Sequence, residues 1–154
     1  MITKIISGGQ TGADQGGLAA AKELGLETGG TAPKGYKTEL GINLYLKEFG
    51  LIESKSSDYK SRTIENIQNS DGTVIFGNTT STGSKLTLNT CIKLRKSYII
   101  NPSKLELIKW IYILRIHILN VAGNRESVNS GIQNRVRDFL IMCLSSGEYK
   151  NANS

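Results

Sequence analysis

The sequence has only two cysteines and a single histidine, and this scarcity excludes several kinds of site. Cys91 and Cys143 lie far apart, in segments that we expect to be helical and half apolar, so buried free thiols are predicted. The sequence has no CxxC pair, and His117 stands between two isoleucines. A zinc site held by protein ligands is therefore not expected.

Long hydrophobic runs are also missing. No uninterrupted apolar stretch approaches the roughly 18 residues that a membrane span needs. The first residues lead into a predicted strand without an apolar segment of the signal-peptide type. We therefore expect a cytoplasmic protein without a membrane partner.

The charge of the chain is biased, but not extreme. Nineteen Lys and Arg residues against 13 Asp and Glu residues give a formal net charge of +6. This bias suits anionic ligands, but the basic residues are scattered, and no ladder of basic and aromatic residues is visible. The composition therefore argues against nucleic acid as the partner. At 154 residues the chain suits one domain and is short for two.

What is present is a repeated alternation of short apolar strands with helical segments. The predicted strands cover residues 2–6, 73–76, 98–100 and 118–121, and the predicted helices cover 13–24, 59–69, 85–96, a segment that begins near 102, and 130–144. Residues 26–51 keep no period, so we expect mostly loop there, with a short helical turn near 42–48 and a possible edge strand at 51–53.

This alternation predicts the fold class. Strands that alternate with helices form parallel sheets through right-handed crossovers. We therefore predict an α/β protein with a Rossmann-like three-layer α/β/α sandwich and a mostly parallel sheet of about five strands. One ligand-binding domain is expected over residues 1–145, followed by a flexible polar tail over residues 146–154.

A glycine-rich loop connects the first predicted strand to the first predicted helix. Its glycines permit positive φ angles and close approach of a ligand, and the N-terminus of the following helix favours an anion. The spacing fits neither the dinucleotide fingerprint nor the Walker fingerprint, so a simple tight turn is the alternative. We predict that main-chain amides here bind a phosphate. The candidate residues are Gly8, Gly9, Gln10, Thr11, Gly12 and Asp14.

Two further polar loops follow predicted strands, and in a parallel sheet such loops meet at one edge. Thr82, Gly83 and Ser84 offer hydroxyls and amides just before a helix, although Ser and Thr are also ordinary N-caps. Lys34 and Arg62 are additional candidate cations on other segments.

The last of these loops follows the strand predicted at residues 118–121. Arg125 could bind a phosphate, and Glu126 could orient the arginine or accept from a ribose hydroxyl, although a surface ion pair is the alternative. Asn120 and Gly123 complete the candidate residues of this loop.

Several motifs occur in order along the chain. They are SGGQTGAD at 7–14, TGG at 28–30, PKG at 33–35, DY at 58–59, RT at 62–63, SDGT at 70–73, LNVAG at 119–123, RES at 125–127 and GI at 131–132. With these motifs the chain resembles the circularly permuted YpsA branch of the SLOG superfamily, whose members are also named molybdenum carrier proteins. The resemblance extends from Ile5 to about Leu140.

The resemblance implies a Rossmann-like fold, a homo-oligomer such as a dimer or tetramer, and a pocket for a nucleotide or nucleotide-derived ligand. Related SLOG proteins include phosphoribohydrolases, DNA-uptake proteins and sensor domains for ADP-ribose-type signals. Two positions depart from the expected pattern. Gln15 stands where an arginine is expected, and Thr82-Gly83-Ser84 replaces a Gly-Gly-Thr. The loss of that arginine would remove a bidentate anion contact.

Three functions remain open at this point. The first is binding of a phosphorylated nucleotide-like molecule without turnover, because the glutamate that follows the second glycine loop in the phosphoribohydrolases is missing after Gly83. The second is a carrier of molybdenum cofactor, whose phosphate would occupy the same loops. The third is a hydrolase of the nucleotide N-glycosidic bond, with Asp14 or Glu126 as the acidic group. No metal ligand is predicted, and the nucleotide or molybdenum cofactor would be a bound ligand.

Overall fold

The computed structural model describes residues 1–152, and its centre is a sheet of five strands. All strand pairs in this sheet are parallel. The strands are β1 (Lys4–Ile6), β2 (Glu27–Gly29), β7 (Gly72–Phe76), β8 (Tyr98–Ile100) and β9 (Ile118–Gly123), in the spatial order β2-β1-β9-β7-β8. The predicted five-stranded Rossmann-like fold is therefore confirmed.

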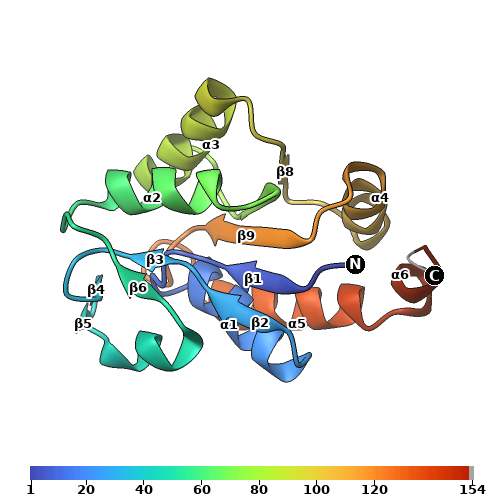
Figure 1. Ribbon diagram of the computed structural model, residues 1–154, viewed down its shortest axis with the longest axis horizontal. Coiled ribbons are helices and arrows are strands. Elements are labelled where there is room, and N and C mark those ends of the chain that lie inside the picture. The colour runs from blue at the N-terminus through green and yellow to red at the C-terminus, as the bar shows by residue number, and fades with distance from the viewer. Residues whose placement is uncertain (153–154) are drawn as a thin grey trace.

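Helices cover both faces of this sheet (Figure 1). On one face, α1 (Ala13–Glu23) packs against α5 (Ile132–Leu144), and on the other face α2 (Tyr59–Gln68) packs against α3 (Thr82–Leu94). At one end of the molecule, α4 (Lys104–Leu114) packs against α5 and α6 (Gly147–Ala152). The result is the predicted three-layer sandwich. None of the helices within residues 1–152 is long and apolar enough to cross a membrane.

The central strands are buried on both sides, which explains their continuous apolar sequence. Val74 and Ile75 of β7 and Leu119 and Val121 of β9 are almost fully buried. Ile5 of β1 belongs to the same core. Because helices shield both faces, none of these strands shows the alternation of apolar and polar residues that marks a half-exposed strand.

The segment between β2 and α2 holds more structure than the sequence predicts. Its elements are β3 (Thr31–Ala32), paired in parallel with β6 (Ile52–Glu53), a hairpin of β4 (Lys37–Thr38) and β5 (Gly41–Ile42), and the 3-10 helix η1 (Leu44–Phe49). The predicted turn near 42–48 corresponds to η1, and the predicted edge strand at 51–53 corresponds to β6. The strand β2 was not predicted, because its three residues, ETG, carry no apolar pattern and are held only by pairing with β1.

Residues 147–152, which the sequence analysis expects in a flexible tail, form α6 instead. Tyr149 anchors this helix. Its side chain is only 3% exposed, and its hydroxyl accepts a hydrogen bond from the main-chain N–H of Ile2 at 2.8 Å. One aromatic residue in a polar stretch is a weak sequence signal, and its burial depends on a contact 147 residues away. Residues 153–154 of the expected tail lie outside the described residues.

Candidate functional site

A pocket of about 430 Å³ lies at the carboxyl edge of the sheet. The loops that follow β1, β7 and β9 meet there, together with the first turns of α2 and α3. The sheet order places β9 between β1 and β7, and the chain leaves β1 toward β2 but leaves β7 toward β8. The crossovers therefore diverge at this point, which is where parallel α/β sheets bind ligands.

In the loop after β1, main-chain N–H groups donate hydrogen bonds to other groups of the protein. The four consecutive N–H groups of residues 9–12 donate to side-chain oxygens of Ser7, Asp14, Gln10 and Gln133, respectively, at 3.0 to 3.3 Å. The next N–H group, that of Ala13, donates to the carbonyl oxygen of Asn124 at 3.1 Å. These five amides hold the loop in shape, so the geometry gives no support to their predicted role as phosphate donors.

The glycines of this loop also have a packing role. Gly12 has a φ of 83°, and a Cβ atom there would overlap the carbonyl oxygen of Asn124. A Cβ atom on Gly9 would lie 2.7 Å from Leu46 Cδ1. Gly8 faces the pocket, where the Arg62 guanidinium packs directly against it. Two of the three glycines therefore permit close contact between chain segments, and only Gly8 lies against the pocket.

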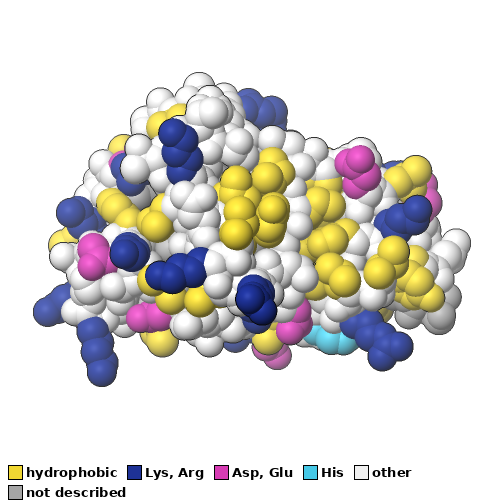
Figure 2. All heavy atoms as spheres, turned by 90° about the horizontal axis from the view of Figure 1, so that it is seen from above, with side chains coloured by type: hydrophobic (Ala, Val, Ile, Leu, Met, Phe, Trp, Pro, Cys, Tyr) yellow, Lys and Arg dark blue, Asp and Glu magenta, His cyan; other side chains and the backbone are white. Residues whose placement is uncertain are grey.

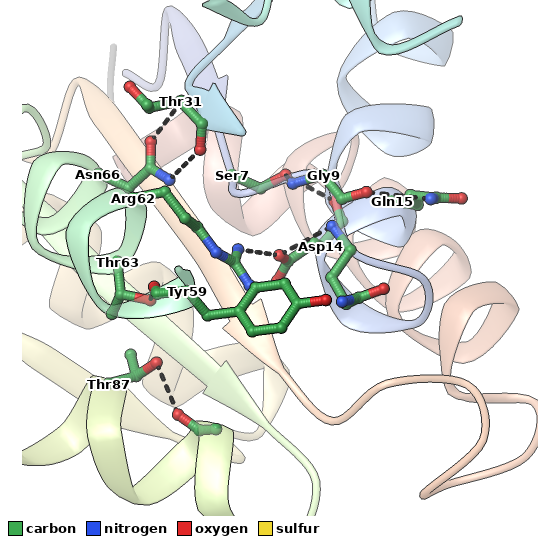
Figure 3. A network of polar contacts seen from close by, with 12 residues as sticks. Ser7, Gly9, Asp14, Gln15, Thr31, Tyr59, Arg62, Thr63, Asn66 and Thr87 are labelled. Carbon is green, nitrogen blue, oxygen red and sulfur yellow. Dashed lines mark hydrogen bonds and ion pairs between the residues drawn. The ribbon is translucent and has the colours of Figure 1, made fainter. Parts of the chain in front are cut away.

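Asp14 and Arg62 form an ion pair inside the pocket. Arg62 Nη1 lies 2.8 Å from Asp14 Oδ2, and the two side chains are only 13% and 8% exposed. Figure 3 shows the pair coming from two elements, with Asp14 in the first turn of α1 and Arg62 on α2. Burial raises the pKa of Asp14 above its ordinary value, although the charge and hydrogen bond of Arg62 act in the opposite direction.

The first turn of α3 is open toward the pocket. This helix begins at Thr82, three residues before the predicted start, because Ser81 is its N-cap and accepts from the N–H of Ser84 at 3.4 Å. Thr82 and Gly83 line the pocket, and within residues 1–152 their N–H groups find no acceptor. A Cβ atom on Gly83 would meet no atom within 4 Å. This helix N-terminus therefore offers the free amides that the first loop lacks.

Arg125 brings a positive charge to the same pocket. Its guanidinium carbon lies 4.9 Å from the ring centroid of Tyr59, and that of Arg62 lies 5.4 Å from the same ring. Among the described residues Arg125 forms no ion pair and donates no side-chain hydrogen bond. A half-buried guanidinium with free donors, next to an open helix N-terminus, is suited to bind an anion.

Asn124 holds the second and third loops together, although no sequence pattern predicts this role. Its side-chain amide donates to the carbonyl oxygen of Asn78 and to the hydroxyls of Ser81 and Ser84, at 2.9 to 3.3 Å. Its side-chain oxygen accepts from the N–H of Asn78 at 2.6 Å. The only sequence signal was its place between Gly123 and Arg125.

Two glutamates outside the pocket lining fix the loops that surround it. Glu126 accepts from the N–H groups of Gly131 at 2.5 Å and Gln133 at 3.0 Å, so it caps the start of α5. Glu39, which the sequence analysis did not single out, accepts from the hydroxyls of Thr11 and Ser127 and from the N–H of Ser127 at 3.2 Å. These hydrogen bonds outweigh the effect of burial and hold the pKa of Glu39 below its ordinary value.

The structure divides the predicted site residues into two groups. Those that line the pocket are Gly8, Gln10, Asp14, Arg62, Thr82, Gly83, Asn120, Gly123 and Arg125. Among the described residues, those outside the lining are Gly9, Thr11, Gly12, Lys34, Ser84 and Glu126. Lys34 is exposed at the start of the segment that leads to β4. Residues 1–152 contain no group of three or more His, Cys, Asp or Glu side chains that could hold a metal ion.

A parallel sheet whose loops form a polar pocket at its carboxyl edge defines a Rossmann-like α/β domain. The model of the Circularly permutated YpsA SLOG family matches residues 5–144, and the chain belongs to this family. The chain is also similar to the crystal structure of a protein named "Putative molybdenum carrier protein" from Syntrophus aciditrophicus SB, with 34% identity and a TM-score of 0.83. The match covers 94% of this chain and 96% of the other. No curated protein matches the chain.

Proposed function

We propose that the protein binds a phosphorylated nucleotide or nucleotide-derived molecule in this pocket, as a sensor, carrier or sequestering protein that does not turn its ligand over. ADP-ribose-type molecules and cyclic nucleotides belong to this class. The observation that carries the proposal is the pairing of the open first turn of α3, at Thr82 and Gly83, with the unpaired guanidinium of Arg125. The amides and the helix dipole would hold the phosphate, and Arg125 would add charge-assisted hydrogen bonds.

The pocket also has walls that suit a flat ring. Leu86, Val121 and Val128 contribute apolar surface, and Tyr59 contributes an aromatic ring. Pockets for small ligands combine such walls with a few convergent polar groups. A nucleotide has both parts, a planar base and an anionic phosphate.

The proposal is tested by thermal shift with a panel of nucleotides, followed by recovery of the best ligand after hours of incubation. A ligand at a hundredfold excess over its dissociation constant stabilises a folded protein by about 2.7 kcal/mol, so a true ligand raises the melting temperature measurably. Recovery of intact ligand by denaturation and chromatography supports binding without turnover. A panel in which no phosphorylated nucleotide shifts the melting temperature contradicts the proposal.

A second candidate is a carrier of molybdenum cofactor, and the name of the similar crystal structure favours it. The phosphate of that cofactor would occupy the same first turn of α3. Mass spectrometry of protein purified under conditions that preserve bound ligands distinguishes the two candidates, because a pterin and a nucleotide differ in mass.

A third candidate is hydrolysis of the N-glycosidic bond of a nucleotide, and Asp14 is the observation that favours it. Its carboxyl lies buried in the pocket with a raised pKa, as is typical of groups that donate a proton in catalysis. Glu126, the other candidate acid, is occupied as the cap of α5. Appearance of free base and ribose phosphate in the incubation described above would establish this activity.

A homo-oligomer and a cytoplasmic location are further parts of the proposal. Large apolar side chains are exposed on one face of the molecule, and Figure 2 shows them gathered over the region of α3, β8 and α4. Contiguous apolar surface of this kind often marks a contact between proteins.

A further inference from the structure

The floor of the pocket contains two buried nitrogen donors without an acceptor. Gln10 is only 5% exposed, and its side-chain Nε2 has no hydrogen-bond partner among the described residues. The Nε atom of Arg62 is in the same situation. The oxygen of the Gln10 amide is fully used, because it accepts from the N–H groups of Thr11 and Glu39. Buried donors without acceptors are rare in folded proteins, and a cluster of them in a pocket points to a ligand that supplies the acceptor.

Asp14, which contacts other atoms of the same two residues, supplies an acceptor. Asp14 Oδ2 accepts from Arg62 Nη1 at 2.8 Å and from the N–H of Gln10 at 3.2 Å. The second oxygen, Oδ1, accepts no hydrogen bond from residues 1–152. One carboxylate oxygen and two donor nitrogens are therefore available within a single cluster of three side chains.

A hydroxyl group matches the free donors and the free acceptor of this cluster better than the phosphate or the base of a nucleotide does. It donates to Asp14 Oδ1 and, through the same oxygen, accepts from Gln10 or Arg62. A phosphate would place its negative charge next to the Asp14 carboxylate, and the open turn of α3 offers it a better position. We infer that the floor of the pocket binds a ribose hydroxyl, so that the ligand is a ribonucleotide. This inference rests on the proposed function and narrows it.

Tyr59 lines the same pocket, and we expect its ring to turn aside when the sugar enters. Figure 3 shows its ring beside the Asp14 and Arg62 contact. The ring is held by cation–π contacts with Arg62 and Arg125, and its hydroxyl forms no hydrogen bond with the described residues. Such contacts are weak at partly exposed positions, so the ring can move at little cost. Its movement would uncover the donors of Gln10 and Arg62.

The experiment compares matched ligands on the native protein by isothermal titration calorimetry. The probes are AMP, ADP, GMP and GDP with their 2′-deoxy and 3′-deoxy counterparts. We expect at least one deoxy form of the bound nucleotide to bind about 10- to 100-fold more weakly, because a hydrogen bond to a charged group is lost. Equal affinity for all three sugars would overturn the inference and leave the proposed function standing. Absence of binding by every one of these probes would overturn the inference, while the wider thermal-shift panel described above decides the proposed function.

A variant of Asp14 tests whether its carboxylate accepts the hydrogen bond from the ribose hydroxyl. Asp14→Asn keeps the size of the side chain but removes its charge, and we expect it to reduce the preference for ribose to about threefold or less, as a lost charge-assisted bond implies. Asp138→Asn, on the outer face of α5, is the matched control and should keep the full preference. An Asp14→Asn protein with undiminished preference overturns the role of Asp14. If that variant does not fold, the matched ligands on the native protein still decide the inference.

Discussion

At the scale of single residues, the positive charge of Arg125 in the pocket is not neutralised by the acidic residue next to it in the sequence. Glu126 follows Arg125 directly in the sequence and was a natural partner for it, yet its carboxylate turns to the main chain of Gly131 and Gln133. Arg125 is left to stack on Tyr59 with its donors free. Adjacent residues therefore have separate roles, one structural and one available to a ligand.

Arg125→Ala should weaken binding of a phosphorylated ligand by about 2 kcal/mol, because charge-assisted hydrogen bonds to the phosphate are lost. The measurement is the dissociation constant from calorimetry, with the free energy of unfolding measured in parallel. Arg137→Ala is the matched control, since Arg137 pairs with Asp138 on the exposed side of α5. Equal losses for the two variants would show that Arg125 does not contact the ligand.

The two thiols should be unreactive in the folded protein. Cys91 and Cys143 are fully buried, and burial raises the pKa of Cys143 to about 11 and also raises that of Cys91. At pH 8 almost no thiolate is then present, and the thiolate is the reactive form. Ellman's reagent should react with both cysteines only after urea is added, and rapid reaction of either thiol in buffer would contradict their burial.

At the scale of elements, the start of α3 carries most of the proposed ligand site. The predicted helix began at Lys85, and the true start at Thr82 brings Gly83 into the first turn. The sequence could not reveal this shift, because Ser, Thr and Gly suit a loop as well as a cap. The N-cap is secured by Asn124, a residue 43 positions away from Ser81.

Gly83 offers a way to close the pocket without disturbing the fold. Gly83→Ala should stabilise the protein by up to about 1 kcal/mol, since alanine favours the helix and its Cβ meets nothing within 4 Å. Gly83→Leu should fold equally well but extend into the pocket and abolish ligand binding. Urea unfolding and calorimetry on both variants check these outcomes, and normal binding by a folded Gly83→Leu protein would place the ligand elsewhere.

Substitution of Gly12, unlike that of Gly83, should destabilise the protein, because the conformation and packing of this residue require glycine. It lies at φ 83° and ψ −131° as the N-cap of α1, a conformation that essentially only glycine adopts. Gly12→Val should lower the free energy of unfolding by at least about 2 kcal/mol, through backbone strain and overlap with the Asn124 carbonyl. Urea unfolding measures this loss. A Gly12→Val protein of native stability would show that the loop can rearrange, and the role assigned to its amides would then have to be revised.

At the scale of the whole molecule, the strands with strong hydrophobic signals determined how far the fold could be predicted. The apolar runs of β7 and β9 marked the centre of the sheet, and their order with the helices implied parallel pairing. The edge strand β2 escaped prediction because nothing in its three residues identifies it without β1. The same holds for the pocket. Its loops were identified, but two of the five acceptors that occupy the amides of the first loop, Gln133 and Asn124, come from far along the chain.

The exposed apolar surface of α4 is a candidate contact of the expected homo-oligomer, and a substitution can test it. Leu105, Tyr112 and Ile113 of α4 are each more than half exposed. Ile113→Asp should shift the protein to the monomer, because a charge in an apolar contact is costly to bury. Sedimentation velocity measures the change, and Leu40→Asp, in the hairpin of β4 and β5, is a control at another exposed apolar position. An oligomer unaffected by Ile113→Asp would have its contact elsewhere.

The hydrogen bond between Tyr149 and Ile2 joins segments near the two ends of the chain, which lie side by side in Figure 1. A few added residues could therefore close the backbone into a ring without stretching the fold. New ends could then be opened at an exposed turn such as the one at Leu40, whose side chain is 86% exposed. The name of the family to which the chain belongs records such a circular permutation, and end segments that lie close together are the feature that makes a permutation structurally feasible.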